Sequence, residues 1–120
     1  MSHLVSIQTK VRDPAAIAAA CKRIGIADPE VGTEALYGGS VHGLLVRLEG
    51  WTYPAVVDLA TGEVTYDNYE GAWGDQAKLD QFLQMYAVEK AKLEARRMGY
   101  AVTEQALQNG SIQIQVLERG

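Results

Sequence analysis

Cysteine and histidine are scarce in this sequence of 120 residues. Cys21 is the only cysteine, which excludes an intrachain disulfide, a cysteine-based zinc site and a disulfide-stapled secreted mini-domain. The two histidines, His3 and His42, form no HxxxH pair. Four acidic residues of interest are spread over predicted turns and one strand: Asp58, Asp67, Glu70 and Asp75. Because a metal site needs several ligands at useful spacing, we expect neither a metal ion nor a cofactor.

An excess of positive charge is also missing. The formal net charge is -4 and the isoelectric point is about 5.1, which argues against attraction of the whole surface to nucleic acid or anionic membranes. The opening MSHLVSIQTKVRD alternates apolar and polar residues without a continuous apolar run, so it is neither a signal peptide nor a membrane span. These features predict a cytoplasmic protein with no nucleic-acid partner and no membrane partner.

Motifs of nucleophilic catalysis and of phosphate binding are absent as well. The sequence contains no GxSxG and no Cys/His pair at informative spacing. The glycine-rich stretch YGGSVHG, Tyr37 to Gly43, lacks the Lys-Ser/Thr of a phosphate loop and leads into a predicted strand, not a helix. The sequence therefore favours a non-enzymatic protein, and an enzyme whose scattered acids converge in three dimensions remains an alternative.

Clear local signals mark the first strand and the first helix. Residues 4–11 alternate as a half-buried strand requires. Asp13-Pro14 then supplies an N-cap and a proline at the first helical position, and Gly25 is placed to end the helix. One apolar stripe runs along this helix through Ile17, Ala20, Cys21 and Ile24. We expect Cys21 to lie in the core.

Glycines and prolines break the pattern that follows. Residues 26–43 predict a long connection, with YGGSVHG as a flexible lead into a strand over residues 44–48. A tight turn at Glu49-Gly50 would lead into a strand over residues 51–57, would place Leu48 opposite Trp51 and would leave Pro54 at a bulge or an unpaired edge. A loop over 58–62 precedes a further strand over 63–69.

The last third of the chain has the strongest periodicity. Residues 75–98 predict a helix, with Asp75 near its start, Arg96 and Arg97 near its end, and Gly99 after it. Asn109-Gly110 joins strands over 100–107 and 111–117, and a bulge is needed there to bring the apolar residues of both strands onto one face.

Together these elements predict a single α+β domain over residues 1–120. Its architecture would be a two-layer sandwich, in which a mainly antiparallel sheet has both helices on one face, in the order βαβββαββ. The similar helix ends KRIGIA and ARRMGYA suggest a βαββ duplication with a period near 74 residues.

Four residues are candidates for binding. Trp51 and Trp73 both neighbour glycine-containing turns, where a tryptophan either seals the end of a core or anchors a partner. Gly39 and His42 lie in YGGSVHG, where a ligand pocket is the alternative to a flexible loop with a partly buried strand histidine.

Two blocks carry a resemblance to a known family. The opening MSHLVSIQTKVRD and the closing LDQFLQMYAVEKAKLEARRMGYAVTEQALQNGSIQIQV resemble the hypothetical chloroplast reading frame 35 family of plastid, cyanobacterial and bacterial proteins. The middle of the chain departs from that family, because YDNYEGAWG stands where members tend to have an Ala-Asp-Trp-like element. The family has no determined function and no catalytic residues to carry over.

The resemblance also implies a partner. Bacterial members of that family tend to be encoded near an AAA-type ATPase, which implies an adaptor that binds another protein. We therefore expect a binding or adaptor module, with a small-ligand-binding protein whose pocket lies near Tyr37–Gly43 as the first alternative and an enzyme as the second.

Overall fold

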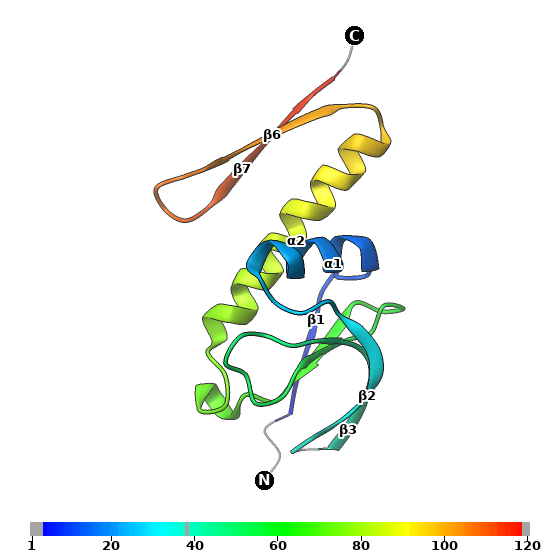
Figure 1. Ribbon diagram of the computed structural model, residues 1–120, viewed down its shortest axis with the longest axis vertical. Coiled ribbons are helices and arrows are strands. Elements are labelled where there is room, and N and C mark those ends of the chain that lie inside the picture. Colours follow the sequence, from blue (N-terminus) through cyan, green and yellow to red (C-terminus); the bar gives the residue numbers. More distant parts are fainter. Residues whose placement is uncertain (1–3, 38, 119–120) are drawn as a thin grey trace.

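The computed structural model describes residues 4–37 and 39–118, which form two α-helices and two antiparallel sheets (Figure 1). The larger sheet has the strand order β1-β5-β4-β3-β2. Its strands are β1 (Val5–Gln8), β2 (Glu30–Leu36), β3 (Gly39–Val46), β4 (Ala55–Val57) and β5 (Glu63–Tyr66). The second sheet pairs β6 (Ala101–Ala106) with β7 (Ile112–Leu117). The α+β class is confirmed, with one strand more than the sequence predicted.

Both helices begin and end at the residues that the sequence marks. Helix α1 (Pro14–Ile24) is capped by Asp13, whose Oδ1 accepts hydrogen bonds from the N–H groups of Ala15 and Ala16 at 2.9 and 3.4 Å. Gly25 ends the helix with a φ of 78°. Asp75 caps α2 (Gln76–Arg97) in the same way, through the N–H of Ala77.

The main core lies between the helices and one face of the larger sheet. Because Leu44 pairs with Val57 and Val57 with Val64, these three side chains lie on one face. Cys21 of α1 and Phe82 of α2 are fully buried against that face. Both helices therefore cover the same side of the sheet, as predicted, and Cys21 is a core residue.

The long connection predicted over residues 26–43 is wrong, because β2 and most of β3 occupy it. Gly32 and Gly43 face each other in the β2–β3 ladder. A Cβ atom at Gly43 would lie 2.6 Å from the carbonyl oxygen of Val57. These glycines permit close approach inside the sheet, and they do not interrupt it. The stretch YGGSVHG is accordingly not a flexible lead: beyond Gly38, which lies outside the described residues, residues 39–43 are strand.

The register predicted for the next hairpin is also wrong. The turn itself forms, since the N–H of Trp51 donates to the carbonyl of Leu48 at 3.2 Å. The ladder, however, pairs Val46 with Ala55, so residues 47–54 form a loop. Pro54 is buried just before β4, where its missing N–H leaves no ladder bond unmade, which matches the unpaired edge expected there.

Strand β5 ends at Tyr66, three residues earlier than predicted, and the one-turn 3-10 helix η1 (Tyr69–Gly71) follows it.

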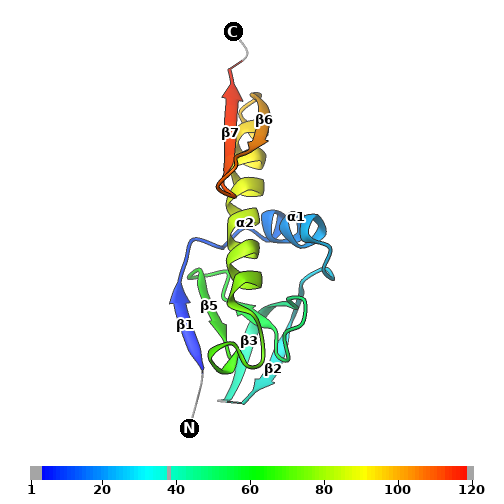
Figure 2. The ribbon, with the colours of Figure 1, turned by 90° about the vertical axis from the view of Figure 1, so that its left-hand side faces the viewer.

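In the C-terminal hairpin, Ile112 of β7 pairs with Ala106 of β6, and Val116 pairs with Val102. This register puts Ile112, Ile114 and Val116 on the same face as Val102 and Ala106, and Gly110 has a φ of 87°, as a bulged hairpin loop requires. Figure 2 shows that this hairpin lies along the end of α2 that projects beyond the larger sheet.

The element order contains two βαββ runs, β1-α1-β2-β3 and β5-α2-β6-β7, but the two runs differ in helix length and in sheet arrangement. Helix α1 has 11 residues and α2 has 22. The β2–β3 hairpin joins the larger sheet, whereas β6 and β7 form a sheet of their own.

Candidate functional site

Trp73 lies at the centre of a group of aromatic rings. Its ring centroid is 5.4 Å from that of Tyr37, which directly follows β2, and 5.7 Å from that of Tyr53. Tyr69 of η1 is closest, at 4.7 Å. Residues from three separate segments thus meet at one place. We call these four residues, Tyr37, Tyr53, Tyr69 and Trp73, the Trp73 cluster.

The Trp73 cluster is held in place but is open to solvent. The N–H of Trp73 donates to the carbonyl of Asn68 at 2.9 Å, and the N–H of Thr52 donates to the carbonyl of Trp73 at 2.8 Å. The rings nevertheless remain accessible, since Tyr37 is 61% exposed and Tyr69 is 43% exposed. Large aromatic side chains fixed at a surface are typical anchors of protein interfaces.

Trp51, the other tryptophan that the sequence indicates as a candidate binding residue, contacts different residues. Its ring lies edge-on to Tyr66, and a Cβ atom at Gly74 would overlap it. Its Nε1–H donates to the carbonyl of Asp75 at 3.0 Å. Trp51 therefore seals the core where loop 67–75 closes over it, and only Trp73 belongs to the exposed cluster.

Gly39 and His42 do not lie in one shared pocket. Gly39 pairs with Leu36 at the end of the β2–β3 hairpin, with a φ of 142° that favours glycine. His42 is exposed, and its Nδ1 lies 2.8 Å from the hydroxyl oxygen of Thr33. His42 lines a cavity of about 330 Å³ together with residues of β2, β3, β4 and the loop after β4, and Gly39 is not among them. The expectation of a partly buried histidine is wrong, because the first part of β3 is accessible to solvent and only its last three residues are buried.

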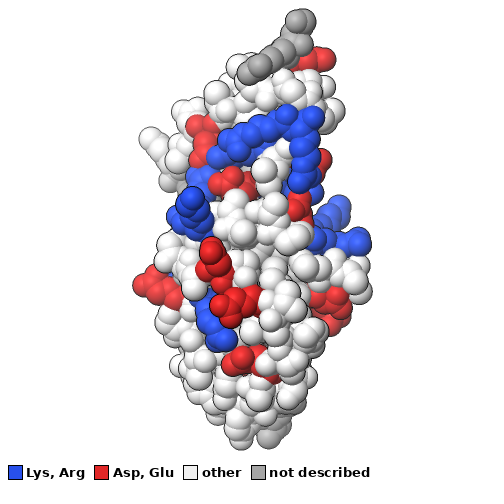
Figure 3. All heavy atoms as spheres, turned by 45° about the vertical axis from the view of Figure 1, so that its right-hand side comes forward, with Lys and Arg blue, Asp and Glu red and all other residues white. Residues whose placement is uncertain are grey.

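Charge is distributed unevenly along the molecule. Residues 30–80, which contain β2 to β5 and the Trp73 cluster, include nine acidic and two basic residues, a net charge of -7. The remainder of the sequence includes six acidic and nine basic residues, a net charge of +3. On the face in Figure 3, Lys and Arg gather over the upper part of the molecule, whereas Asp and Glu predominate below. The overall net charge of -4 is thus the sum of a strongly acidic part, residues 30–80, and a moderately basic remainder.

A buried acid lies in the loop that carries Trp73. Asp67 follows β5 directly and has no exposed surface. Neither of its carboxyl oxygens has a hydrogen-bond partner within the described part of the chain. The backbone that follows is strained, because Tyr69 and Glu70 have positive φ angles of 48° and 53°. A buried polar group without a partner is costly, so this loop is not optimised for stability alone.

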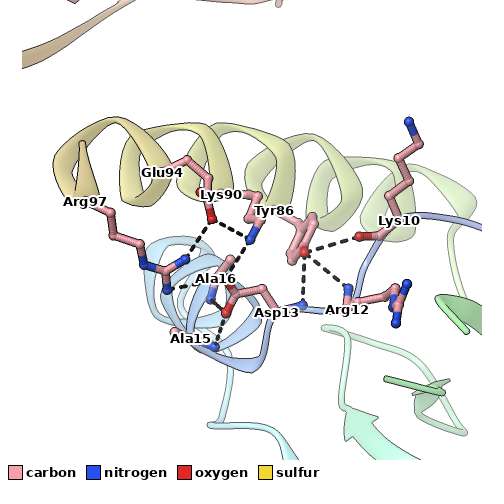
Figure 4. Close-up of polar contacts among 9 residues, drawn as sticks. All are labelled: Lys10, Arg12, Asp13, Ala15, Ala16, Tyr86, Lys90, Glu94 and Arg97. Carbon is pink, nitrogen blue, oxygen red and sulfur yellow. Dashed lines mark hydrogen bonds and ion pairs between the residues drawn. The ribbon is translucent and has the colours of Figure 1, made fainter. Parts of the chain in front are cut away.

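Tyr86 joins the β1–α1 link to α2 (Figure 4). Its hydroxyl oxygen accepts hydrogen bonds from the N–H groups of Arg12 and Asp13 at 3.2 and 3.1 Å, and its hydroxyl donates to the carbonyl of Lys10 at 3.3 Å. Lys90 donates to the carboxylate of Asp13 at 2.9 Å, which lowers the pKa of Asp13. These groups satisfy one another, as expected of a structural joint.

A groove of about 520 Å³ lies beside this joint. Its walls are mainly apolar and come from the segment that links β1 to α1 and from the middle of α2, with Lys10 and Lys90 also in its lining. The lining residues are Thr9, Lys10, Val11, Leu83, Tyr86, Ala87, Lys90 and Ala91. This volume falls within the range of small-molecule sites, and the groove lies away from Tyr37–Gly43.

The sequence pointed to Trp73 but missed the three tyrosines that surround it. Tyr37, Tyr53 and Tyr69 lie 16 positions or more apart, and only tertiary structure brings them together. Within residues 4–37 and 39–118, no three or more His, Cys, Asp or Glu side chains form a group that could hold a metal ion, and no helix is long and apolar enough to cross a membrane.

The fold and the Trp73 cluster define an α+β protein with an exposed aromatic surface at its acidic half. No family model, curated protein or solved structure matches the chain.

Proposed function

We propose that this protein is a non-enzymatic binding module that contacts a protein partner through the Trp73 cluster. The observation that supports this function best is the exposure of Tyr37 and Tyr69 around a Trp73 whose backbone is fixed by hydrogen bonds. Exposed rings on a rigid support lose little conformational freedom on binding, so their burial by a partner is favourable. The family resemblance implies an adaptor that serves an AAA-type ATPase, so such an ATPase is the first partner to test.

Substitution of the exposed tyrosines tests the proposal. Tyr37→Ala and Tyr69→Ala should weaken capture of a purified AAA-type ATPase by on the order of 2 kcal/mol each, while melting temperature changes little. Tyr100→Ala, beyond the C-terminal end of α2, is the control and should leave capture unchanged. Trp51→Ala should instead lower stability by roughly 3 kcal/mol, because its ring seals the core. Capture that survives both cluster substitutions would refute this surface.

The groove beside Tyr86 supports a second candidate function, the binding of a small ligand. Its apolar wall and the two lysines suit an amphipathic molecule with an anionic group. Native mass spectrometry of the purified protein tests for a co-purified ligand of this kind. Ala87→Phe, which places a ring in the groove, should abolish that binding, whereas Ala77→Phe, at another exposed position of α2, should not. A bound molecule retained by Ala87→Phe would exclude the groove.

A further inference from the structure

We infer that the Trp73 cluster binds a basic segment of the partner, with a lysine or arginine side chain lying against the exposed rings of Tyr37 and Tyr69. This inference rests on the proposed function and adds the chemistry of the partner.

The aromatic rings of the cluster can themselves attract a cation. An aromatic face carries partial negative charge, so it attracts an ammonium or guanidinium group placed over it. Four rings within reach of one centre offer several such faces at different orientations, since the ring planes of Tyr37 and Tyr53 make angles of 64° and 76° with that of Trp73. A flexible basic side chain can use these faces while its stem covers apolar ring surface.

The charge of the part of the chain around the rings is predominantly negative. Both basic residues in residues 30–80 already have acidic neighbours: Arg47 lies 3.6 Å from Glu34, and Lys78 lies 3.8 Å from Glu49. Glu70, directly after Tyr69, is exposed and forms no ion pair with any residue that the structure describes. The net charge of -7 in this half would steer a cationic segment toward the cluster.

The loop that carries Tyr69 also contains a buried acid. Asp67 lies two positions before Tyr69, fully buried and without a hydrogen-bond donor among the described residues. The loop thus combines an unsatisfied interior carboxyl group with two strained backbone positions, at Tyr69 and Glu70. An acidic residue in the loop that carries Tyr69 adds to the preference of this surface for a cationic over an apolar partner.

A direct test uses Trp73 as the reporter. Trp51→Phe leaves Trp73 as the single tryptophan, so its fluorescence reports on the cluster. The probes are three capped peptides in which every second residue is glycine. The remaining positions are Lys and Arg in the first peptide, Gln in the second and Leu in the third. The Lys/Arg peptide should change the fluorescence saturably, and high salt should weaken the change because ionic strength screens the attraction. The Gln and Leu peptides should have no saturable effect.

Variants separate the ring contribution from the charge contribution. Tyr37→Phe keeps the aromatic face and should retain affinity, whereas Tyr37→Leu keeps an apolar side chain without that face and should lower affinity by roughly fivefold. Glu70→Gln should lower the affinity for the basic peptide several-fold. Asp80→Asn removes an equal charge from an exposed position on α2 and should have little effect. Melting curves confirm that each variant is folded.

Several outcomes would overturn the inference. A Leu peptide that binds as well as the basic one, or a basic peptide that Tyr37→Leu binds unchanged, would show that no cation lies on the rings. If no basic peptide saturates while Tyr37→Ala still destroys partner capture, the basic-segment inference is wrong and the proposed function stands. If Tyr37→Ala leaves partner capture intact, the proposed function itself is wrong.

Discussion

At the scale of single residues, Asp67 has the least favourable environment. Its carboxyl group is fully buried and has no hydrogen-bond partner within the described residues. We predict that Asp67→Asn raises the free energy of unfolding by on the order of 1 kcal/mol, because a neutral amide of similar shape costs less to bury than a carboxylate. Urea unfolding at neutral pH measures the difference. Asp28→Asn, at an exposed position, is the control, and a destabilised Asp67→Asn would reveal a donor to the native carboxylate.

Cys21 illustrates the opposite case, a reactive group made inert by its position. It has no exposed surface, and burial is the main cause that raises the pKa of its thiol to about 11. The thiolate is the nucleophile, so a buried thiol with a high pKa reacts slowly. We predict that alkylating reagents leave native Cys21 unmodified and label it fully after unfolding in urea. Mass spectrometry follows the labelling, and rapid modification of the folded protein would contradict the burial of this helix face.

At the scale of elements, the sequence predicted best where the signals are local. The start and end of α1 follow from Asp13, Pro14 and Gly25, which lie within one turn of the helix termini. Helix α2 and the C-terminal hairpin were predicted for the same reason, from Asp75 and Asn109-Gly110. Each of these signals acts through neighbouring backbone groups, so no knowledge of distant residues is needed.

Strand β2 was missed because its glycines have a tertiary cause. Gly32 and Gly43 resemble loop residues in the sequence, but they face each other in a ladder. The predicted register between β3 and β4 was wrong because of contacts with a distant loop. Trp51 and Thr52 donate hydrogen bonds to residues of loop 67–75, so residues 51–54 do not continue β4. The same limit explains the site: Trp73 stands out by composition, whereas the three tyrosines around it come from separate segments that only the tertiary fold brings together.

Ion pairs attach the C-terminal hairpin to the helices. Glu104 of β6 accepts a hydrogen bond from Arg23 of α1 at 3.0 Å and lies 3.1 Å from the ammonium of Lys92 of α2. Arg23 is the main cause that lowers the pKa of Glu104 to about 2 from an ordinary 4.5. Because the folded pKa is the lower one, this carboxylate stabilises the fold above pH 4.5, and the contribution disappears as the pH falls toward about 2.

We predict that Glu104→Gln lowers stability at neutral pH by less than about 1 kcal/mol, since the group is largely accessible to solvent. The difference between the native protein and the variant should shrink across the interval from pH 4.5 to about 2. Urea unfolding of both proteins at several pH values measures it. Glu118→Gln, an exposed acid beyond β7, is the matched control. A gap that stays constant with pH would show that Glu104 acts through packing and not through its charge.

At the scale of the whole molecule, α2 connects two unequal parts. The helix is about 33 Å long at 1.5 Å per residue. Its first half buries Leu79, Phe82 and Tyr86 in the core of the larger sheet. Its second half supports β6 and β7, which pair only with each other. The acidic charge and the Trp73 cluster belong to the first part, so the proposed binding surface lies on the part with the large core.

This asymmetry predicts uneven stability. The strands β6 and β7 have no buried residue, whereas all three residues of β4 are buried. A two-stranded sheet is marginal by itself and relies on α2 and on ion pairs such as that between Arg23 and Glu104. We predict that the amides of β6 and β7 exchange hydrogen through local opening, well before those of β4 and β5, which exchange only on global unfolding.

Hydrogen exchange followed by mass spectrometry tests this order. Glu104→Gln should accelerate exchange in residues 101–117 and leave β4 and β5 unchanged, because it removes an attachment of the hairpin and no contact of the main core. Val57→Ala, in the main core, is the contrasting variant and should accelerate exchange in the larger sheet. Equal protection of the two sheets, or acceleration of both by Glu104→Gln, would mean that the molecule opens as one cooperative unit.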